Sequence, residues 1–224
     1  MHTVSIKESF RFGWNAFKKD AGIYIGATAV ALVASFVVNK ISGELGNGLF
    51  GALVSIAGAV LTWWLFLGLT RMTLNSYAGL PVKFDMVFKE SWDVLWRYAL
   101  AAIVTVIVVG IGFILLVVPG IIAQVMLSLT IFLVLEKGMK PIAALKESRR
   151  MTKGKRWDLF LFFLVLVLIN IVGAIPMGLG LLVTLPISLL AFAHVYKAID
   201  KSDDMAPVVP TQMPPAASTG PTVA

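Results

Sequence analysis

The chain has 224 residues, of which 58% are hydrophobic and 14% are charged, and its mean hydropathy is +0.90. Soluble domains are about 45–50% apolar and about 25% charged, so this composition excludes both an ordinary soluble domain and a disordered chain. The chain has no cysteine, which excludes a disulfide scaffold, thiolate catalysis and cysteine-bound zinc.

Long stretches without Asp, Glu, Lys or Arg predict the membrane spans. These stretches are residues 21–39, 45–70, 98–135 and 159–196. Lys40 and Glu44 mark a bend between the first two stretches, and each of the last two is long enough for two crossings of about 20 residues. Turn-forming residues at 118–120 (Val-Pro-Gly) and 175–178 (Ile-Pro-Met-Gly) divide these longer stretches. We therefore predict an all-α integral membrane protein with six transmembrane helices arranged as three hairpins.

The positions of the basic residues predict the orientation. If six spans alternate, 18 of the 19 Lys and Arg residues lie on the side of both termini, and Lys40 alone lies on the other side. Because basic loops stay in the cytoplasm, we expect a multi-pass protein of the cell (cytoplasmic) membrane with cytoplasmic N- and C-termini. The net charge of +7 is confined to segments between the spans, which argues against nucleic acid as a partner.

The triplet Lys-Glu-Ser occurs three times, each time shortly before a pair of predicted spans. The copies are residues 7–9, 89–91 and 146–148. Around the first two copies, aromatic and aliphatic residues fall on one helical face and charged residues on the other, whereas the third copy is more basic and less apolar. The repeat predicts that each hairpin is preceded by an amphipathic helix in the membrane interface. The predicted units are about residues 1–79, 80–138 and 139–200, within a membrane domain at 1–200.

The last segment, residues 201–224, differs in composition. It contains five of the ten prolines, mixed with Ser, Thr, Ala and Gly. Such a segment cannot bury a core, so we predict a disordered Pro-rich tail.

Two Gly-x-Gly elements, Gly110-Ile111-Gly112 and Gly178-Leu179-Gly180, each precede a proline, at Pro119 and Pro186. This pattern is found in re-entrant helices that line a substrate path, and equally in a turn followed by a helix that tolerates a proline. We favour the turn.

Residues 112–156 carry a family resemblance. They contain a Leu-rich hairpin with Pro-Gly, then an acidic residue, then Ala-Leu, Ser and Gly-Lys before the next predicted span. This pattern resembles a widespread group of uncharacterised prokaryotic multi-pass membrane proteins, related to the membrane domain found ahead of some glycerophosphodiester phosphodiesterases. The resemblance covers about residues 84–200 and implies an integral membrane protein with no established activity. We expect no appended catalytic domain.

The sequence contains no recognisable catalytic or metal-binding pattern. Phosphodiester hydrolysis requires metal-binding carboxylates and histidines, and the only histidines are His2 and His194. A lone histidine at the end of a span is typically packed or hydrogen-bonded. We therefore expect no enzyme, no catalytic residue, no cofactor and no metal.

The spans carry neutral polar side chains but no charge. The polar residues noted in the fourth and fifth spans are Gln124, Ser128, Thr130 and Asn170. Ion and proton carriers keep charged residues inside their spans, so we interpret these residues as interhelical hydrogen-bonding groups. A carrier for an apolar molecule needs no such charge and stays open. Small residues at four-residue spacing allow close helix contact, within the chain or with a second copy or another membrane protein.

The segment 137–156 holds eight basic residues and one acidic residue. Each basic residue near an anionic leaflet contributes about 1 kcal/mol. The candidate contacts to anionic lipid headgroups are Arg149, Arg150, Lys153, Lys155 and Arg156. The alternative is that these charges only set the topology. We therefore predict a non-enzymatic membrane protein that organises lipids or partner proteins at the cytoplasmic face; the alternative is a transporter, or an accessory subunit, for a hydrophobic or lipid-like solute.

Overall fold

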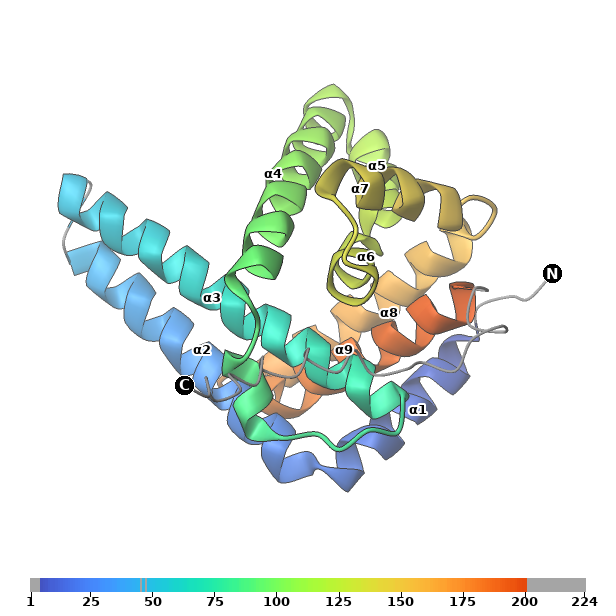
Figure 1. The fold of residues 1–224 in the computed structure, drawn as a ribbon, viewed down its shortest axis with the longest axis horizontal. Coiled ribbons are helices and arrows are strands. Elements are labelled where there is room, and N and C mark those ends of the chain that lie inside the picture. The colour runs from blue at the N-terminus through green and yellow to red at the C-terminus, as the bar shows by residue number, and fades with distance from the viewer. Residues whose placement is uncertain (1–4, 45, 47, 201–224) are drawn as a thin grey trace, which may run out of the picture.

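The computed structural model describes residues 5–44, 46 and 48–200, and this part of the chain is helical, without strands (Figure 1). The predicted disordered tail at 201–224 lies outside the described residues. In chain order the elements are α1 (Ile6–Lys19), α2 (Ala21–Glu44), α3 (Leu49–Tyr77), the 3-10 helix η1 (Phe84–Phe88), α4 (Trp92–Leu115), α5 (Val117–Leu127), α6 (Thr130–Lys137), α7 (Pro141–Met151), α8 (Arg156–Ala174) and α9 (Leu181–Ile199).

Six helical segments are long and apolar enough to cross a membrane, which confirms the predicted number of candidate spans. They are α2, α3, α4, α8, α9 and the segment Val117–Lys137, which contains α5 and α6. Large apolar side chains on these helices face outward, such as Phe36 with 69% and Ile114 with 85% of its surface exposed. Water does not tolerate so much apolar surface on a folded protein, whereas lipid solvates it. The helices therefore indicate a multi-pass membrane protein.

Helix α9 lies at the centre of the packing. It contacts α1, α2, α3 and α8, and residues from it belong to both hydrophobic clusters of the core. Figure 1 shows α1 running alongside α9 rather than standing apart from the bundle. Helix α9 is thus the element against which α1, α2 and α3 pack.

The predicted amphipathic segment at the N-terminus forms α1, capped by Ser5, whose Oγ accepts a hydrogen bond from the backbone N–H of Glu8. Its contact with α9 depends on a small residue. A Cβ atom at Gly13 would lie 2.8 Å from the carbonyl oxygen of Ile187, so only glycine allows this approach. Ser9 is also buried in this contact, whereas Trp14 is exposed. The position of α1 in the membrane interface stays a prediction.

The second predicted amphipathic helix, around residues 84–97, is wrong. The chain forms the short η1, leaves the helical conformation, and starts α4 at Trp92. Ser91 has an extended backbone, and its Oγ accepts a hydrogen bond from the N–H of Val94. A serine in this role caps the following helix and ends any helix before it, so the Trp92–Trp96 face belongs to the first turn of a span.

The turn predicted at 118–120 is also misplaced. The chain turns at Leu116, which has an extended backbone, and Pro119 lies in the first turn of α5. Proline fits there because the first N–H groups of a helix have no intrahelical acceptor. The close contact between α4 and α5 comes from two glycines, since a Cβ atom at Gly112 would lie 2.9 Å from the Cα atom of Gly120.

The turn predicted at 175–178 is confirmed. Helix α8 ends at Ala174 and α9 begins at Leu181, and Met177 and Gly178 have φ angles of 54° and 81°. The two Gly-x-Gly elements are therefore not equivalent, because the first lies inside α4 and the second lies in this turn.

Candidate functional site

The predicted lipid-binding residues lie at the end of α7, on the turn that follows it and at the first residue of α8. Helix α7 starts with Pro141, whose fixed φ suits the first helical position. Its apolar face, with Ala144 and Leu145, is buried, and the helix packs mainly against α4, α5 and α6. The predicted unit boundaries assign α7 to the third unit, but α7 packs mainly against helices of the second.

We call Arg149, Arg150, Lys153, Lys155 and Arg156 the basic surface. Lys155 is half-buried and the other four side chains are exposed. Gly154, with a φ angle of 83°, provides the left-handed conformation that turns the chain from α7 into α8. The structure thus presents all five residues around one tight connection between two helices.

Within the basic surface, Arg150 is engaged by an acidic neighbour. Its Nε donates to Glu147 Oε2 at 2.8 Å, and its Nη2 also donates to the same carboxylate. The hydrogen bond from Arg150 holds the pKa of Glu147 below its usual range. The other four residues of the basic surface form no ion pair within the described part of the chain. These four are the charges available to an external anion.

Helix α7 is fixed to the membrane domain by a break in the fourth span. Helix α5 ends at Leu127 and α6 begins at Thr130, which frees backbone groups between them. The hydroxyl of Ser148, which is fully buried, accepts from the N–H of Leu129 at 3.2 Å and donates to the carbonyl of Met126 at 2.8 Å. The serine of the third Lys-Glu-Ser triplet therefore supplies hydrogen-bond partners to the backbone groups freed at the break. The basic surface starts at the next residue, Arg149.

An apolar cleft of about 490 Å³ opens between α5 and α8, beside the basic surface. Its lining includes Ile121, Ile122, Val125, Arg156, Trp157 and Phe160. Trp157 and Phe160 stack with their ring centroids 5.4 Å apart, and Trp157 is largely exposed. We call this the α5–α8 cleft. A guanidinium at the edge of an apolar cleft matches an amphiphile with an anionic head and a hydrocarbon chain.

The sequence did not single out Trp157 or the cleft. The available signal was the Arg156-Trp157 pair at the start of a span, which is typical of a membrane–water interface. The partner residues on α5 carry no distinguishing mark, because apolar side chains fill every span.

Other charges in this region hold helices together. Lys137 Nζ lies 2.9 Å from Asp200 Oδ1, and Lys197 forms an ion pair with Glu136, so two pairs join the end of α6 to the end of α9. Lys137 belongs to the basic segment found in the sequence, but its contact is structural. It is therefore not part of the basic surface.

The remaining candidates from the sequence have packing partners. His194 Nδ1 lies 3.1 Å from Ser9 Oγ, and the ring stacks on Phe12. Asn170 donates through Nδ2 to Ser188 Oγ at 2.9 Å, which joins α8 to α9 as predicted. The same prediction is wrong for Ser128 and Thr130, whose hydroxyls donate to the carbonyls of Val125 and Leu127 in their own span. Among residues 5–44, 46 and 48–200, no group of three His, Cys, Asp or Glu side chains is placed to hold a metal ion.

Comparison with known proteins gives a single assignment. Residues 82–203 match the family described as "Protein of unknown function (DUF975)". No curated protein and no solved structure matches the chain. The match gives no support to the narrower relation with glycerophosphodiester phosphodiesterases. It covers more than half of the chain, and the protein therefore belongs to this uncharacterised DUF975 family.

Proposed function

We propose that this protein is a non-enzymatic membrane protein that binds anionic phospholipids at the cytoplasmic face and thereby organises lipids or partner proteins there. The single observation that carries the proposal is the position of Arg156. Its side chain belongs to the basic surface and also lines the α5–α8 cleft. One residue thus joins a cationic site for a phosphate to an apolar site for an acyl chain.

The charge of the basic surface supports the choice of an anionic lipid. Arg149, Lys153, Lys155 and Arg156 supply four positive charges without an internal partner in the described residues. Each contributes about 1 kcal/mol near an anionic leaflet. An aromatic residue at the same level, Trp157, suits the headgroup region. The apolar cleft adds a chain site that a purely topological role does not require.

Neutralising the basic surface tests the proposal. The variant R149Q/K153Q/K155Q/R156Q removes the four unpaired charges but leaves Arg150 with Glu147. In nanodiscs of mixed phosphatidylcholine and phosphatidylglycerol, native mass spectrometry of the wild type should show retained phosphatidylglycerol. The variant should lose this preference by about tenfold or more, given the contribution of each charge.

A matched control separates a specific site from general attraction. The variant K7Q/R11Q/K18Q/K19Q removes four basic residues of α1, which lies on the same predicted side of the membrane. It should retain clearly more phosphatidylglycerol than R149Q/K153Q/K155Q/R156Q, because it removes only general attraction to the leaflet and leaves the proposed site intact. Equal losses in both variants, or no loss in either, would contradict a lipid site on the basic surface.

The cleft is tested by filling it while keeping the charges. Replacing Ile122, which lines the α5–α8 cleft, by tryptophan should reduce retention of long-chain phosphatidylglycerol. Binding of a soluble analogue, glycerol phosphate, should be unchanged, because it uses only the charges. Unchanged retention of the long-chain lipid would show that the acyl chain lies elsewhere.

We further propose that the protein lies in the cell membrane with both termini in the cytoplasm. The naturally cysteine-free chain allows a direct test with single cysteines and an impermeant maleimide. A cysteine at Glu44, the last residue of α2, should react in intact cells, and one at Lys153 should react only after permeabilisation. The opposite pattern would reverse the orientation and remove the basic surface from the anionic cytoplasmic leaflet.

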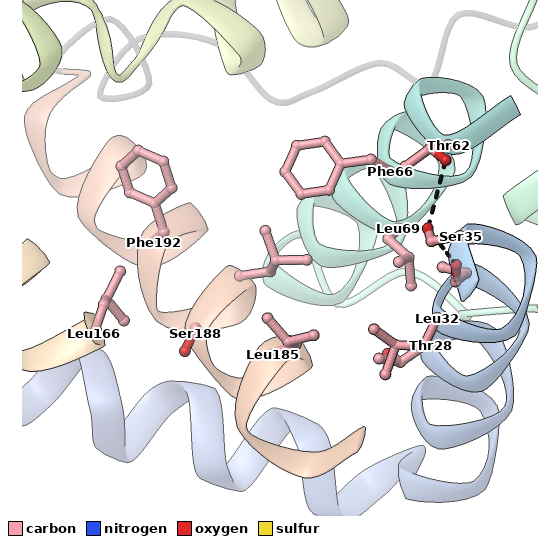
Figure 2. A pocket seen from close by; sticks show the side chains of 12 residues that line it. Thr28, Leu32, Ser35, Thr62, Phe66, Leu69, Leu166, Leu185, Ser188 and Phe192 are labelled. Carbon is pink, nitrogen blue, oxygen red and sulfur yellow. Dashed lines mark hydrogen bonds between the residues drawn. The ribbon is translucent and has the colours of Figure 1, made fainter. Parts of the chain in front are cut away.

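A second candidate function is the carriage of a hydrophobic or lipid-like solute, as a transporter or an accessory subunit. The observation that favours it is another cleft, enclosed by α2, α3, α8 and α9 (Figure 2). Uptake of a labelled solute into proteoliposomes distinguishes carriage from lipid organisation.

A narrower relation to the membrane domain of glycerophosphodiester phosphodiesterases is a proposal that rests on the pattern in residues 112–156 alone.

A further inference from the structure

The cleft between the first and last hairpins differs in chemistry from the basic surface. It has a volume of about 250 Å³, and Figure 2 shows α9 on one side and α2 and α3 on the other, with Leu166 entering from α8. Its walls are mostly leucine and phenylalanine, such as Phe66 and Phe192. None of the residues that line it is charged. We call it the central cleft; its walls suit an uncharged, largely apolar occupant.

A second cavity, of about 440 Å³, adjoins the central cleft along α8. The two share Leu166 and Leu185 as lining residues, so they are neighbours. Asn170 lines the outer cavity and Ser188 lines the central cleft, and the two are hydrogen-bonded at 2.9 Å. A polar pair therefore stands where the outer cavity meets the central cleft.

This pair has unused hydrogen-bonding capacity. The Oδ1 atom of Asn170 is buried and has no hydrogen-bond partner in the part of the chain that the structure describes. Ser188 accepts the bond from Asn170 through its oxygen, so its own proton remains available to donate. One turn earlier on α9, the buried Oγ1 atom of Thr184 also lacks a partner among the described residues. Buried polar atoms are normally satisfied, so these atoms indicate a missing polar partner.

On the opposite wall of the central cleft, Ser35 and Thr62 are hydrogen-bonded within the protein. Ser35 donates to the carbonyl of Ala31 at 2.8 Å and lies 3.5 Å from the hydroxyl of Thr62, as Figure 2 shows for the second contact. Asn170 Oδ1 and Thr184 Oγ1, the fully buried atoms without a partner described above, lie on the α8–α9 side.

We propose that the central cleft binds a neutral amphiphile with a hydroxyl head, such as a long-chain or isoprenoid alcohol. Its hydroxyl oxygen accepts a hydrogen bond from Ser188 Oγ, which lines the cleft, while its chain lies between α9 and the α2–α3 hairpin. The hydroxyl thus supplies the acceptor that the Ser188 proton lacks. The site shares no residue with the basic surface, so it goes beyond the anionic-lipid function and is independent of it.

Photolabelling tests the proposal on the full chain in nanodiscs. The probe is hexadecanol that carries a diazirine in its chain, and the comparison probe is the same diazirine-bearing chain without the hydroxyl. Peptide mapping should place the crosslinks of the alcohol on α2, α3 and α9 at the central cleft, with weaker labelling there by the hydrocarbon. Excess unlabelled hexadecanol should compete.

Two variants test separately the hydroxyl contact at Ser188 and the open volume of the central cleft. Replacing Ser188 by alanine should lower labelling by the alcohol about threefold, the factor given by one hydrogen bond of average strength in a membrane protein. Replacing Ala31 by leucine keeps the polar pair but fills the cleft, and should abolish labelling there. The controls Thr105→Val and Ala102→Leu make matched changes on α4 and should label like the wild type.

Several outcomes would overturn the proposal. Equal labelling by the alcohol and the hydrocarbon would show that the hydroxyl is not recognised, and crosslinks spread evenly over the lipid-facing helices would show that the cleft is not a site. Full labelling of either cleft variant would do the same. The variant R149Q/K153Q/K155Q/R156Q should keep its labelling, so failure of the anionic-lipid proposal is seen separately.

Discussion

Replacing Ser148 by alanine tests whether the break in the fourth span is held by α7. The hydroxyl of Ser148 serves both ends of the break, as acceptor for the N–H of Leu129 and donor to the carbonyl of Met126. In the variant, Met126 keeps only the 3.4 Å contact with Thr152 Oγ1, and Leu129 loses its acceptor. Ser148 is fully buried, so bulk water does not replace the hydroxyl.

The expected loss follows from these two contacts. A buried N–H group left without an acceptor costs about 1–3 kcal/mol, whereas an average polar contact in a membrane protein contributes only about 0.6 kcal/mol. Because Ser148→Ala removes both a donor and an acceptor at a broken helix, we expect the free energy of unfolding to fall by about 2 kcal/mol. Titration with sodium dodecyl sulfate in mixed micelles, followed by circular dichroism, measures this change.

The serines of the other two Lys-Glu-Ser triplets are matched controls. Ser91 caps α4 through a 3.4 Å contact at an exposed position, and Ser9 donates to the carbonyl of Ser5 and lies beside His194. Neither substitution by alanine leaves a broken span, so each should cost about 1 kcal/mol or less. A loss in Ser148→Ala no larger than that in Ser91→Ala would refute the role assigned to Ser148.

Three further predictions concern packing and charge. Gly13→Leu should separate α1 from α9 and expose α1 to protease, because a carbonyl of α9 lies 2.8 Å from the position of a Cβ atom, whereas Gly22→Leu, with no atom within 4 Å, should not. Arg71→Met should lower the free energy of unfolding by about 3 kcal/mol, because it leaves the buried Glu90 carboxylate without its partner at 2.8 Å, and adding Glu90→Met should recover most of the loss in a double-mutant cycle. Binding to vesicles of a sulfate lipid, whose charge does not titrate, should increase only when the pH falls below the lowered pKa of Glu147, where protonation releases Arg150. Glu147→Gln should bind at the higher level throughout.

The sign of the pH effect on stability is fixed by the direction of the shift. The pKa of Glu147 is lower in the folded protein than in the unfolded chain, because Arg150 binds the ionised carboxylate. The stabilisation is therefore present above the unfolded value of about 4.3 and is lost as the pH falls through the folded value. Arg150 is fully exposed, so the effect on stability is small and the binding measurement is the more sensitive assay.

The number of spans could be predicted because lipid imposes a simple rule. A charge-free stretch must satisfy its backbone internally, so residues 21–39, 45–70, 98–135 and 159–196 could form only helices. The rule is insensitive to detail. Pro119 is compatible with a turn and with the first turn of a helix, and the sequence alone did not decide between the two.

The roles of the repeated triplet could not be predicted, because they depend on distant partners. Ser148 acts on Leu129, 19 residues earlier, and Ser9 lies against His194, 185 residues later. The serines of the three identical triplets therefore make three different contacts. Ser9 lies beside a residue of another helix, Ser91 caps a helix, and Ser148 bonds to the backbone at the break in the fourth span. The basic surface could be found from charge density alone, whereas the clefts depend on which apolar faces meet.

The same helix that closes the broken span also carries the charges, and this arrangement gives a last prediction. Ser148 and Arg149 are consecutive on α7, so the position of the basic surface relative to α5 and α8 is set by the contacts at the break. Ser148→Ala keeps every charge but loosens that position, and should therefore weaken retention of phosphatidylglycerol in nanodiscs as well as lower stability. The variant R149Q/K153Q/K155Q/R156Q should lose retention with little change in stability, because its four exposed or half-buried side chains form no ion pair in the described structure. Ser148→Ala could instead be destabilised but retain the lipid like the wild type. The position of α7 would then not matter for binding, and the lipid would be held by general attraction to the charges rather than by a shaped site.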